Sequence, residues 1–251
     1  DKYPSLSPYN YCAWNPVKLV DPDGRKIRIT ENLNEYTYNS QDNCFYNSEG
    51  ELYQSDFSNA VIEAFNMMSK TELGKEMIGI YANSEDYNID LASGFYTETY
   101  LDGASDNLNF DLANNKPGSP DWVNVSISWA YQSAAEYPMT DGTINKDSKW
   151  DLVDEFAHAF LYAKGLATNR FSAIKRSNDS FCLYLDEFSA AYYYNLVRYQ
   201  SNLDSFRKDY YNSSTAKVDK KGNITLFAPS YLPIPDWASG VSMHMDYRME
   251  Q

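Results

Sequence analysis

The stretch Asp154-Glu155-Phe156-Ala157-His158 decides how this chain is interpreted. Residues four positions apart on an α-helix share a face, so Asp154 and His158 can direct a carboxylate and an imidazole at one point. Both groups are ordinary zinc ligands, and Glu155 beside them is suited to take a proton from a metal-bound water. One helical turn therefore offers two metal ligands and a general base.

Two helices are expected to carry the polar residues of interest. The first covers residues 147–164, with an aspartate or serine cap at its start and a glycine stop after it. Helical periodicity puts Asp154 and His158 on the edge of an apolar stripe, which predicts that both are half-buried. The second helix covers residues 183–199 and carries Glu187, 29 residues after His158.

The rest of the chain predicts a mixture of helices and strands. Apolar residues recur at helical spacing in residues 56–70 and 71–81. Strands are expected over residues 26–30, 87–91, 107–112 and 122–129, with a loop at 114–120. The expected fold class is α+β, with a small mixed or antiparallel sheet beside the helix that carries the site. If residues 122–129 form an edge strand, an extended peptide could pair with it.

Composition narrows the classes of partner. The chain has 251 residues, 43% hydrophobic and 16% aromatic, which is typical of a globular protein. Its 21 Lys and Arg against 35 Asp and Glu give a net charge of -14, which opposes binding to nucleic acid. No apolar run approaches the roughly 18 residues needed to span a membrane. The three cysteines lack the spacing of a disulfide framework or a cysteine zinc site.

The first residues form a distinct segment. Proline and asparagine recur in it, which excludes a long helix, and Asp-Pro-Asp-Gly at 21–24 is a strong turn signal. The residues that match a known pattern are Tyr9, Tyr11, Asn15, Pro16, Asp21, Pro22 and Gly24. With them the segment closely resembles the end of the core domain of RHS-repeat proteins. The resemblance implies that residues 1–25 are the tail of an RHS core and residues 26–251 a variable C-terminal domain, often a toxin. It further implies a secreted or cell-surface location within a larger bacterial protein, or delivery into a target cell, with a cognate immunity protein as partner.

A second resemblance covers roughly residues 56–200. It rests on Thr71, Gly74, Glu155, His158, Ala159, Glu187, Ala190, Asn195 and Arg198. These residues are similar to the pattern of zinc-metallopeptidase (zincin) domains among polymorphic toxins, where Ser/Thr-x-x-Gly, His-Glu-x-x-His-Ala, Glu-x-x-Ala and Asn-x-x-Arg follow in order. The 29-residue separation is close to that of the glutamate ligand in gluzincin-type peptidases. The chain departs from the pattern at Asp154, where the family has its first histidine.

The resemblance implies a role for each matching residue. It makes Glu155 the general base and His158 and Glu187 zinc ligands, with Asp154 in the remaining ligand position. The implied reaction is hydrolysis of a peptide bond by metal-activated water, with a protein or peptide as substrate. Two carboxylates beside the imidazole would make a bound zinc a weaker Lewis acid. Asp154 therefore indicates a domain that has the peptidase-like fold but a degenerate site, rather than an intact peptidase. Residues that could stabilise the transition state or support the ligands are Tyr231, His244 and Arg198.

Two other interpretations stay open. A histidine on a helix edge is often a packing residue, and Glu187 could pair with Arg198 or a lysine in an ordinary helical ion pair. The chain could also be a non-enzymatic binding or adhesion module at the tip of a surface protein, since its many tyrosines suit recognition. Convergence of the Asp154, His158 and Glu187 side chains would favour the peptidase-like interpretation.

Overall fold

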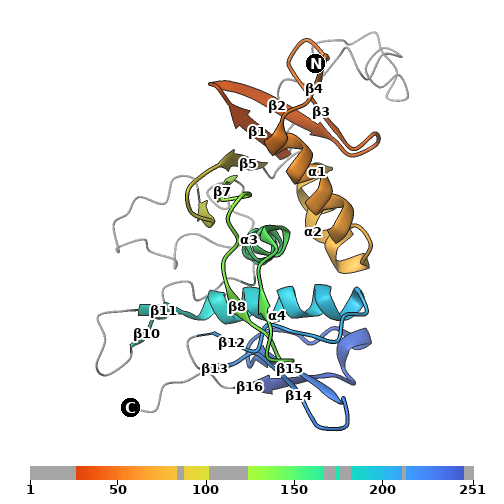
Figure 1. Ribbon diagram of the computed structural model, residues 1–251, viewed down its shortest axis with the longest axis vertical. Coiled ribbons are helices and arrows are strands. Elements are labelled where there is room, and N and C mark those ends of the chain that lie inside the picture. Colours follow the sequence, from red (N-terminus) through yellow and green to blue (C-terminus); the bar gives the residue numbers. More distant parts are fainter. Residues whose placement is uncertain are drawn as a thin grey trace.

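The computed structural model describes residues 27–83, 88–101, 124–164, 166, 173–175, 182–210 and 213–245. Within these ranges the fold is α+β, as the sequence predicts, with four α-helices, a mixed seven-stranded sheet and several small sheets. The helices are α1 (Asp56–Met68), α2 (Glu72–Ala82), α3 (Ser148–Ala163) and α4 (Leu185–Gln200). α3 lies in the middle, between the layer of α1, α2 and the sheet and the layer of α4 and the small sheets (Figure 1).

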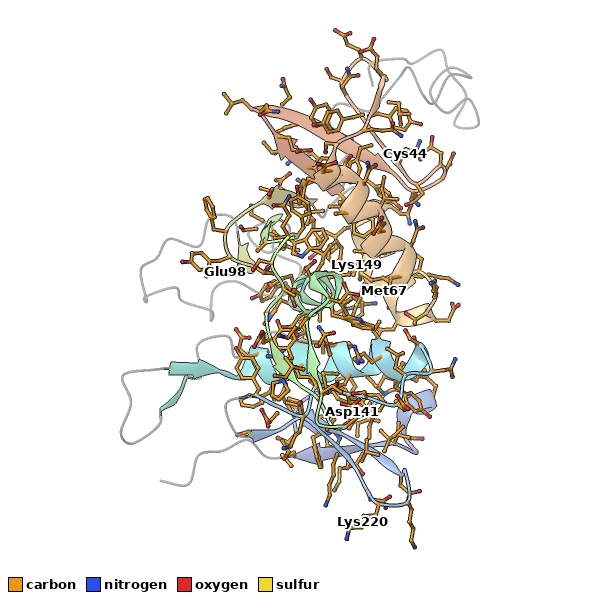
Figure 2. All side chains as sticks on the ribbon, viewed as in Figure 1. Cys44, Met67, Glu98, Asp141, Lys149 and Lys220 are labelled. Atoms are coloured by element: carbon orange, nitrogen blue, oxygen red, sulfur yellow. The ribbon has the colours of Figure 1, made fainter. Side chains whose placement is uncertain are left out.

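The large sheet has the strand order β4-β3-β2-β1-β5-β7-β6. Its strands are β1 (Ile27–Glu31), β2 (Asn34–Asn39), β3 (Cys44–Tyr46), β4 (Leu52–Tyr53), β5 (Asn88–Ser93), β6 (Glu98–Leu101) and β7 (Asn124–Trp129). The pairs β1–β5 and β5–β7 are parallel and the other pairs antiparallel. The strand expected at 122–129 is present as β7, but it is not an edge strand, because β6 pairs with it and is the outermost described strand on this side. Glu98, at its start, is labelled in Figure 2.

Caps and one close backbone approach fix where the helices begin. Ser55 forms a capping box at the start of α1, and Asp147 caps α3. Thr71 accepts the N–H of Gly74 at 2.9 Å, and a Cβ on Gly74 would lie 2.1 Å from the carbonyl oxygen of Met68. The Ser/Thr-x-x-Gly pattern therefore has a structural role here, because it caps α2 and lets the turn from α1 pass close to it.

α3 is buried on all sides. Every residue from Trp150 to Tyr162 is at most 8% exposed, so the expectation that Asp154 and His158 are half-buried is wrong. The physical reason is that α1 and α2 pack on one side of α3 and α4 packs on the other, which leaves no solvent face. Polar groups in such a helix need partners inside the protein, because an unpaired buried charge is strongly unfavourable.

The C-terminal part packs on α4. β15 lies against α4 and pairs with β14 and β16, and the turn between β14 and β15 carries Lys220 at the far end of the molecule (Figure 2). The elements outside the large sheet are β8 (Tyr137–Pro138), β9 (Ile144–Asn145), β10 (Ala173–Lys175), β11 (Cys182–Tyr184), β12 (Asp209–Tyr210), β13 (Ser213–Ser214), β14 (Ala216–Val218), β15 (Ile224–Pro229), the 3₁₀ turn η3 (Asp236–Ala238) and β16 (Ser242–Met245).

Several expectations lie outside the described residues. These are the RHS-like tail at 1–25, the strand at 107–112, the loop at 114–120 and the glycine stop after α3. None of the helices in the described ranges has the length and apolar character required to cross a bilayer.

Candidate functional site

α3 and α4 bring an imidazole and a carboxylate together. His158 Nε2 lies 3.5 Å from Glu187 Oε2, and the two side chains are 8% and 28% exposed. Burial works to raise the pKa of Glu187, but His158, a hydrogen bond from Tyr210 and the charge of Arg207 outweigh it and hold this pKa at about 2. Glu187 is therefore ionised at neutral pH and reaches solvent at the edge of the site.

Glu155 is a carboxyl group of the opposite character. It is 8% exposed, and Thr99 of β6 donates a hydrogen bond to its Oε2. Burial raises its pKa to about 8, because the opposing effects of His158 and Thr99 are smaller. Two carboxyl groups beside one imidazole thus hold different protonation states at neutral pH, with Glu155 protonated and Glu187 ionised.

The carboxylate of Asp154 is bound to a cation of the protein itself. Arg207 Nη1 donates to Asp154 Oδ2 at 2.9 Å, and the two side chains of this pair are only 5% and 7% exposed. The guanidinium carbon lies 4.0 Å from the ring centroid of Tyr137 and 4.6 Å from that of Tyr210. Burial works to lower the pKa of Arg207, but Asp154 and the tyrosines raise it above its ordinary value, so the guanidinium stays charged.

The backbone of Arg207 is held as firmly as its side chain. Asn195 accepts the N–H of Arg207 at 2.8 Å and donates to its carbonyl oxygen at 3.0 Å. Thr215 donates a second hydrogen bond to the same carbonyl oxygen at 2.7 Å. The asparagine of the Asn-x-x-Arg pattern therefore fixes the segment that supplies the buried cation.

Arg207 is the site residue that sequence reasoning missed. It lies 53 residues after Asp154, outside any predicted helix or strand. Asn195 is part of the Asn-x-x-Arg pattern, but its position on a helix does not show that it binds the backbone of Arg207. A buried aspartate requires a cation, but the sequence offers many lysines and arginines and no spacing that selects one.

Tyr231, His244 and Arg198, the residues expected to stabilise the transition state or support the ligands, lie in different surroundings. Tyr231 shares a hydrogen bond with Ser189 of α4. His244 is exposed on β16, with Nδ1 3.4 Å from the carbonyl oxygen of Pro229.

Arg198 is a packing residue in this fold. Its Nε donates to the carbonyl oxygen of Ser205 at 2.6 Å, and its guanidinium carbon lies 4.5 Å from the ring centroid of Trp150. The alternative in which Glu187 pairs with Arg198 does not hold, because Glu187 contacts His158 and Arg198 binds the carbonyl oxygen of Ser205.

The donor set around Asp154 does not fit a divalent metal. His158 and Glu187 converge, but the third ligand position is paired with Arg207, and the described residues hold no group of three His, Cys, Asp or Glu side chains arranged to bind a metal ion. Asp154 Oδ1 is buried without a hydrogen-bond partner, so one ligand atom remains. A dication bound there would lie within a few ångströms of a guanidinium, a repulsion of several kcal/mol.

Fold and site together define an α+β domain with a buried, internally paired charge cluster between two packed helices. Comparison of the chain with protein-family models, with curated proteins and with solved structures found no match in any of the three.

Proposed function

We propose that this chain is a C-terminal, effector-like domain of an RHS-repeat protein that descends from a zincin metallopeptidase and acts by binding a protein or peptide without hydrolysing it. The proposal combines the RHS-like tail at 1–25 with the placement of Glu155, His158 and Glu187 on two packed helices. In this proposal the parent protein is secreted or displayed on a bacterial cell surface, and an immunity protein is one class of partner.

One observation carries the loss of hydrolysis. The buried ion pair between Asp154 and Arg207 gives the carboxylate a fixed cation at 2.9 Å. A metal-activated water needs a metal with an open position, and the guanidinium offers no such position. Without that water Glu155 has no proton to take, and its raised pKa of about 8 keeps it protonated, so it is a poor base at neutral pH.

Binding is supported by the outer strand of the sheet. β6 is the last strand of the described sheet, and an outer antiparallel strand directs half of its backbone groups away from its neighbour. Thr99 of this strand contacts Glu155, so a peptide added along β6 would run past the charge cluster. Phe95 and Tyr96, just before the strand, are 96% and 77% exposed and offer apolar contacts.

Metal content and peptide cleavage test the proposal directly. Wild-type protein, Glu155→Gln and the double variant Asp154→His/Arg207→Met are equilibrated with zinc, dialysed, analysed for metal by mass spectrometry and assayed on a fluorogenic peptide library. We expect substoichiometric zinc in the wild type and the same background cleavage in wild type and Glu155→Gln. The double variant is expected to retain zinc, because it restores the histidine and removes the competing cation.

Two outcomes would contradict different parts of the proposal. Stoichiometric zinc with cleavage that Glu155→Gln abolishes would show an active peptidase. A folded double variant that gains no zinc would remove the support for metallopeptidase descent. Binding itself is measured on a peptide array, where Phe95→Ser/Tyr96→Ser should weaken capture and Leu33→Ser, a change at an equally exposed site, should not.

A further inference from the structure

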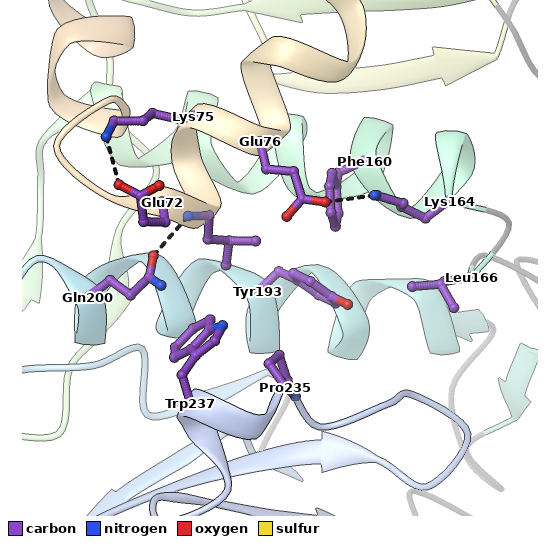
Figure 3. A pocket seen from close by; sticks show the side chains of 11 residues that line it. Glu72, Lys75, Glu76, Phe160, Lys164, Leu166, Tyr193, Gln200, Pro235 and Trp237 are labelled. Carbon is purple, nitrogen blue, oxygen red and sulfur yellow. Dashed lines mark hydrogen bonds and ion pairs between the residues drawn. The ribbon is translucent and has the colours of Figure 1, made fainter.

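A groove lies away from the charge cluster. Its volume is about 610 Å³, and α2, the end of α3, α4 and the segment around η3 contribute to it (Figure 3). None of Asp154, Glu155, His158 and Glu187 lines it. Its floor and rim combine aromatic rings with amide and charged groups, the composition of a site for a small polar ligand.

Three polar groups that line the groove, the Tyr193 hydroxyl, the Gln200 NH₂ and the Trp237 indole N–H, make no hydrogen bond to the described residues. Tyr193 is 4% exposed, and its ring packs on Phe160 and Tyr192, but its hydroxyl makes no hydrogen bond to the described residues. Gln200 uses its Oε1 to accept the N–H of Leu73 at 2.9 Å, which leaves its NH₂ group for a ligand. The Tyr193 hydroxyl is not sealed from solvent, so it can donate a hydrogen bond to a ligand that enters the groove.

Trp237 is the third group and the most exposed. It is 46% exposed at the rim of the groove and has neither a ring contact nor a hydrogen bond with the described part of the chain. Figure 3 shows its indole beside Pro235 and across from Tyr193. A large aromatic ring left unpacked at the mouth of a groove offers a flat apolar face together with one N–H donor.

The charges of the groove are already paired. Lys75 Nζ lies 2.7 Å from Glu72 Oε1, and Lys164 Nζ lies 2.6 Å from Glu76 Oε1. These pairs leave no lone charge to bind an ionic ligand, and the net charge of -14 repels an anion. The lining comes from helices and a 3₁₀ turn, so a peptide finds no strand edge to pair with.

We propose that this groove binds a neutral oligosaccharide. A sugar ring presents an apolar C–H face, which stacks on the exposed indole of Trp237, and a rim of hydroxyl oxygens, which accept hydrogen bonds from Tyr193 and Gln200. The binding site would be separate from the peptide-binding strand β6 and would hold the domain on a glycan-bearing surface.

The test follows the indole N–H of Trp237 by NMR in protein labelled with ¹⁵N-tryptophan, with the resonance assigned by its loss in Trp237→Phe. The probes are chitotriose, cellotetraose, maltotetraose and xylotetraose, each titrated to about 10 mM. We expect saturable shifts of this resonance with at least one glycan. Trp237→Ala should weaken that binding about tenfold or more and Tyr193→Phe several-fold, measured by calorimetry. Leu52→Ala, a change at a residue 53% exposed on β4, should leave it unchanged.

Each remaining outcome overturns the assignment. No saturable shift with any of the four glycans would remove the ligand class. Glycan binding that Trp237→Ala and Tyr193→Phe leave unchanged, in variants whose circular dichroism spectra match the wild type, would place the site elsewhere. Shifts of the same resonance by a proline-rich decapeptide, but by none of the glycans, would identify the groove as a peptide site.

Discussion

Removing the positive charge from Arg207 should destabilise the folded protein by about 3–5 kcal/mol, the usual loss when one partner of a buried ion pair is deleted. In Arg207→Met the Asp154 side chain, only 7% exposed and with its Oδ1 already buried without a partner, loses its cation at 2.9 Å. The contacts of the guanidinium with Tyr137 and Tyr210 are lost as well. A domain with a typical stability of about 5–15 kcal/mol would keep a measurable folded population at the upper end of that range.

A second variant, Asp154→Leu/Arg207→Met, distinguishes the effect of losing one charge of the ion pair from the effect of changing side-chain volume. Asp154→Leu/Arg207→Met replaces both charges with apolar groups, and such replacements are often neutral or stabilising by about 1–4 kcal/mol. We therefore expect the double variant to be more stable than Arg207→Met, which gives a coupling energy of several kcal/mol in a double-mutant cycle.

Urea unfolding at neutral pH, followed by circular dichroism and tryptophan fluorescence, measures the free energy of unfolding of each variant. Lys75→Met is the matched control, because its ion pair with Glu72 is just as short at 2.7 Å but its side chain is 54% exposed. It should change stability by less than about 1 kcal/mol. A loss below about 1 kcal/mol in Arg207→Met, or additive effects in the double variant, would refute the reasoning.

Three further outcomes are expected. The folded protein keeps the proton of Glu155 up to a pKa of about 8, whereas the unfolded chain loses it near 4.5, so this group's stabilisation falls as pH rises between these values. Glu155→Gln should flatten that part of the stability profile, measured by urea unfolding from pH 5 to 8. Glu187 has its pKa lowered to about 2, so its contribution is present above pH 4.5 and lost as pH falls towards 2, and Glu187→Gln should be less sensitive to acid in the same assay. Gly74→Ala should lower the free energy of unfolding by about 1–3 kcal/mol, because the new Cβ would lie 2.1 Å from the Met68 carbonyl oxygen. Gly79→Ala is the control, since its Cβ would lie 3.6 Å from the nearest atom, and it should be neutral or stabilising by up to about 1 kcal/mol. Thermal unfolding measures both variants.

The sequence predicted the helices well because their signals are local. The apolar residues Val61, Phe65 and Met68, which recur at helical spacing in residues 56–70, are fully buried in α1, and the helix expected over 71–81 is present as α2. Local periodicity could not predict that α3 is buried on every side, since that depends on how many elements pack around it. The two-residue strands also lack a detectable period, because alternation needs about four residues to be seen.

For the candidate site, the sequence predicted which helices carry polar groups but not which groups would pair. The resemblance implies that His158 and Glu187 lie together, the residues alone left this open, and the two side chains are 3.5 Å apart. The partner of Asp154 could not be predicted, because Arg207 is placed by hydrogen bonds from Asn195 and Thr215 that depend on the folded chain. Long-range pairing of this kind has no signature in the spacing of residues.

The identity of residue 154 and the presence of Arg207 depend on each other physically. A carboxylate that is 5% exposed requires a nearby positive charge, whereas a neutral histidine at the same position would leave the buried guanidinium of Arg207 without its anion. Replacing Asp154 alone or Arg207 alone is therefore strongly unfavourable. Only replacing both leaves no unpaired charge in the interior. A metal at this position would also have to displace the internal cation, so the charge balance that stabilises the helix pair is the same feature that opposes zinc.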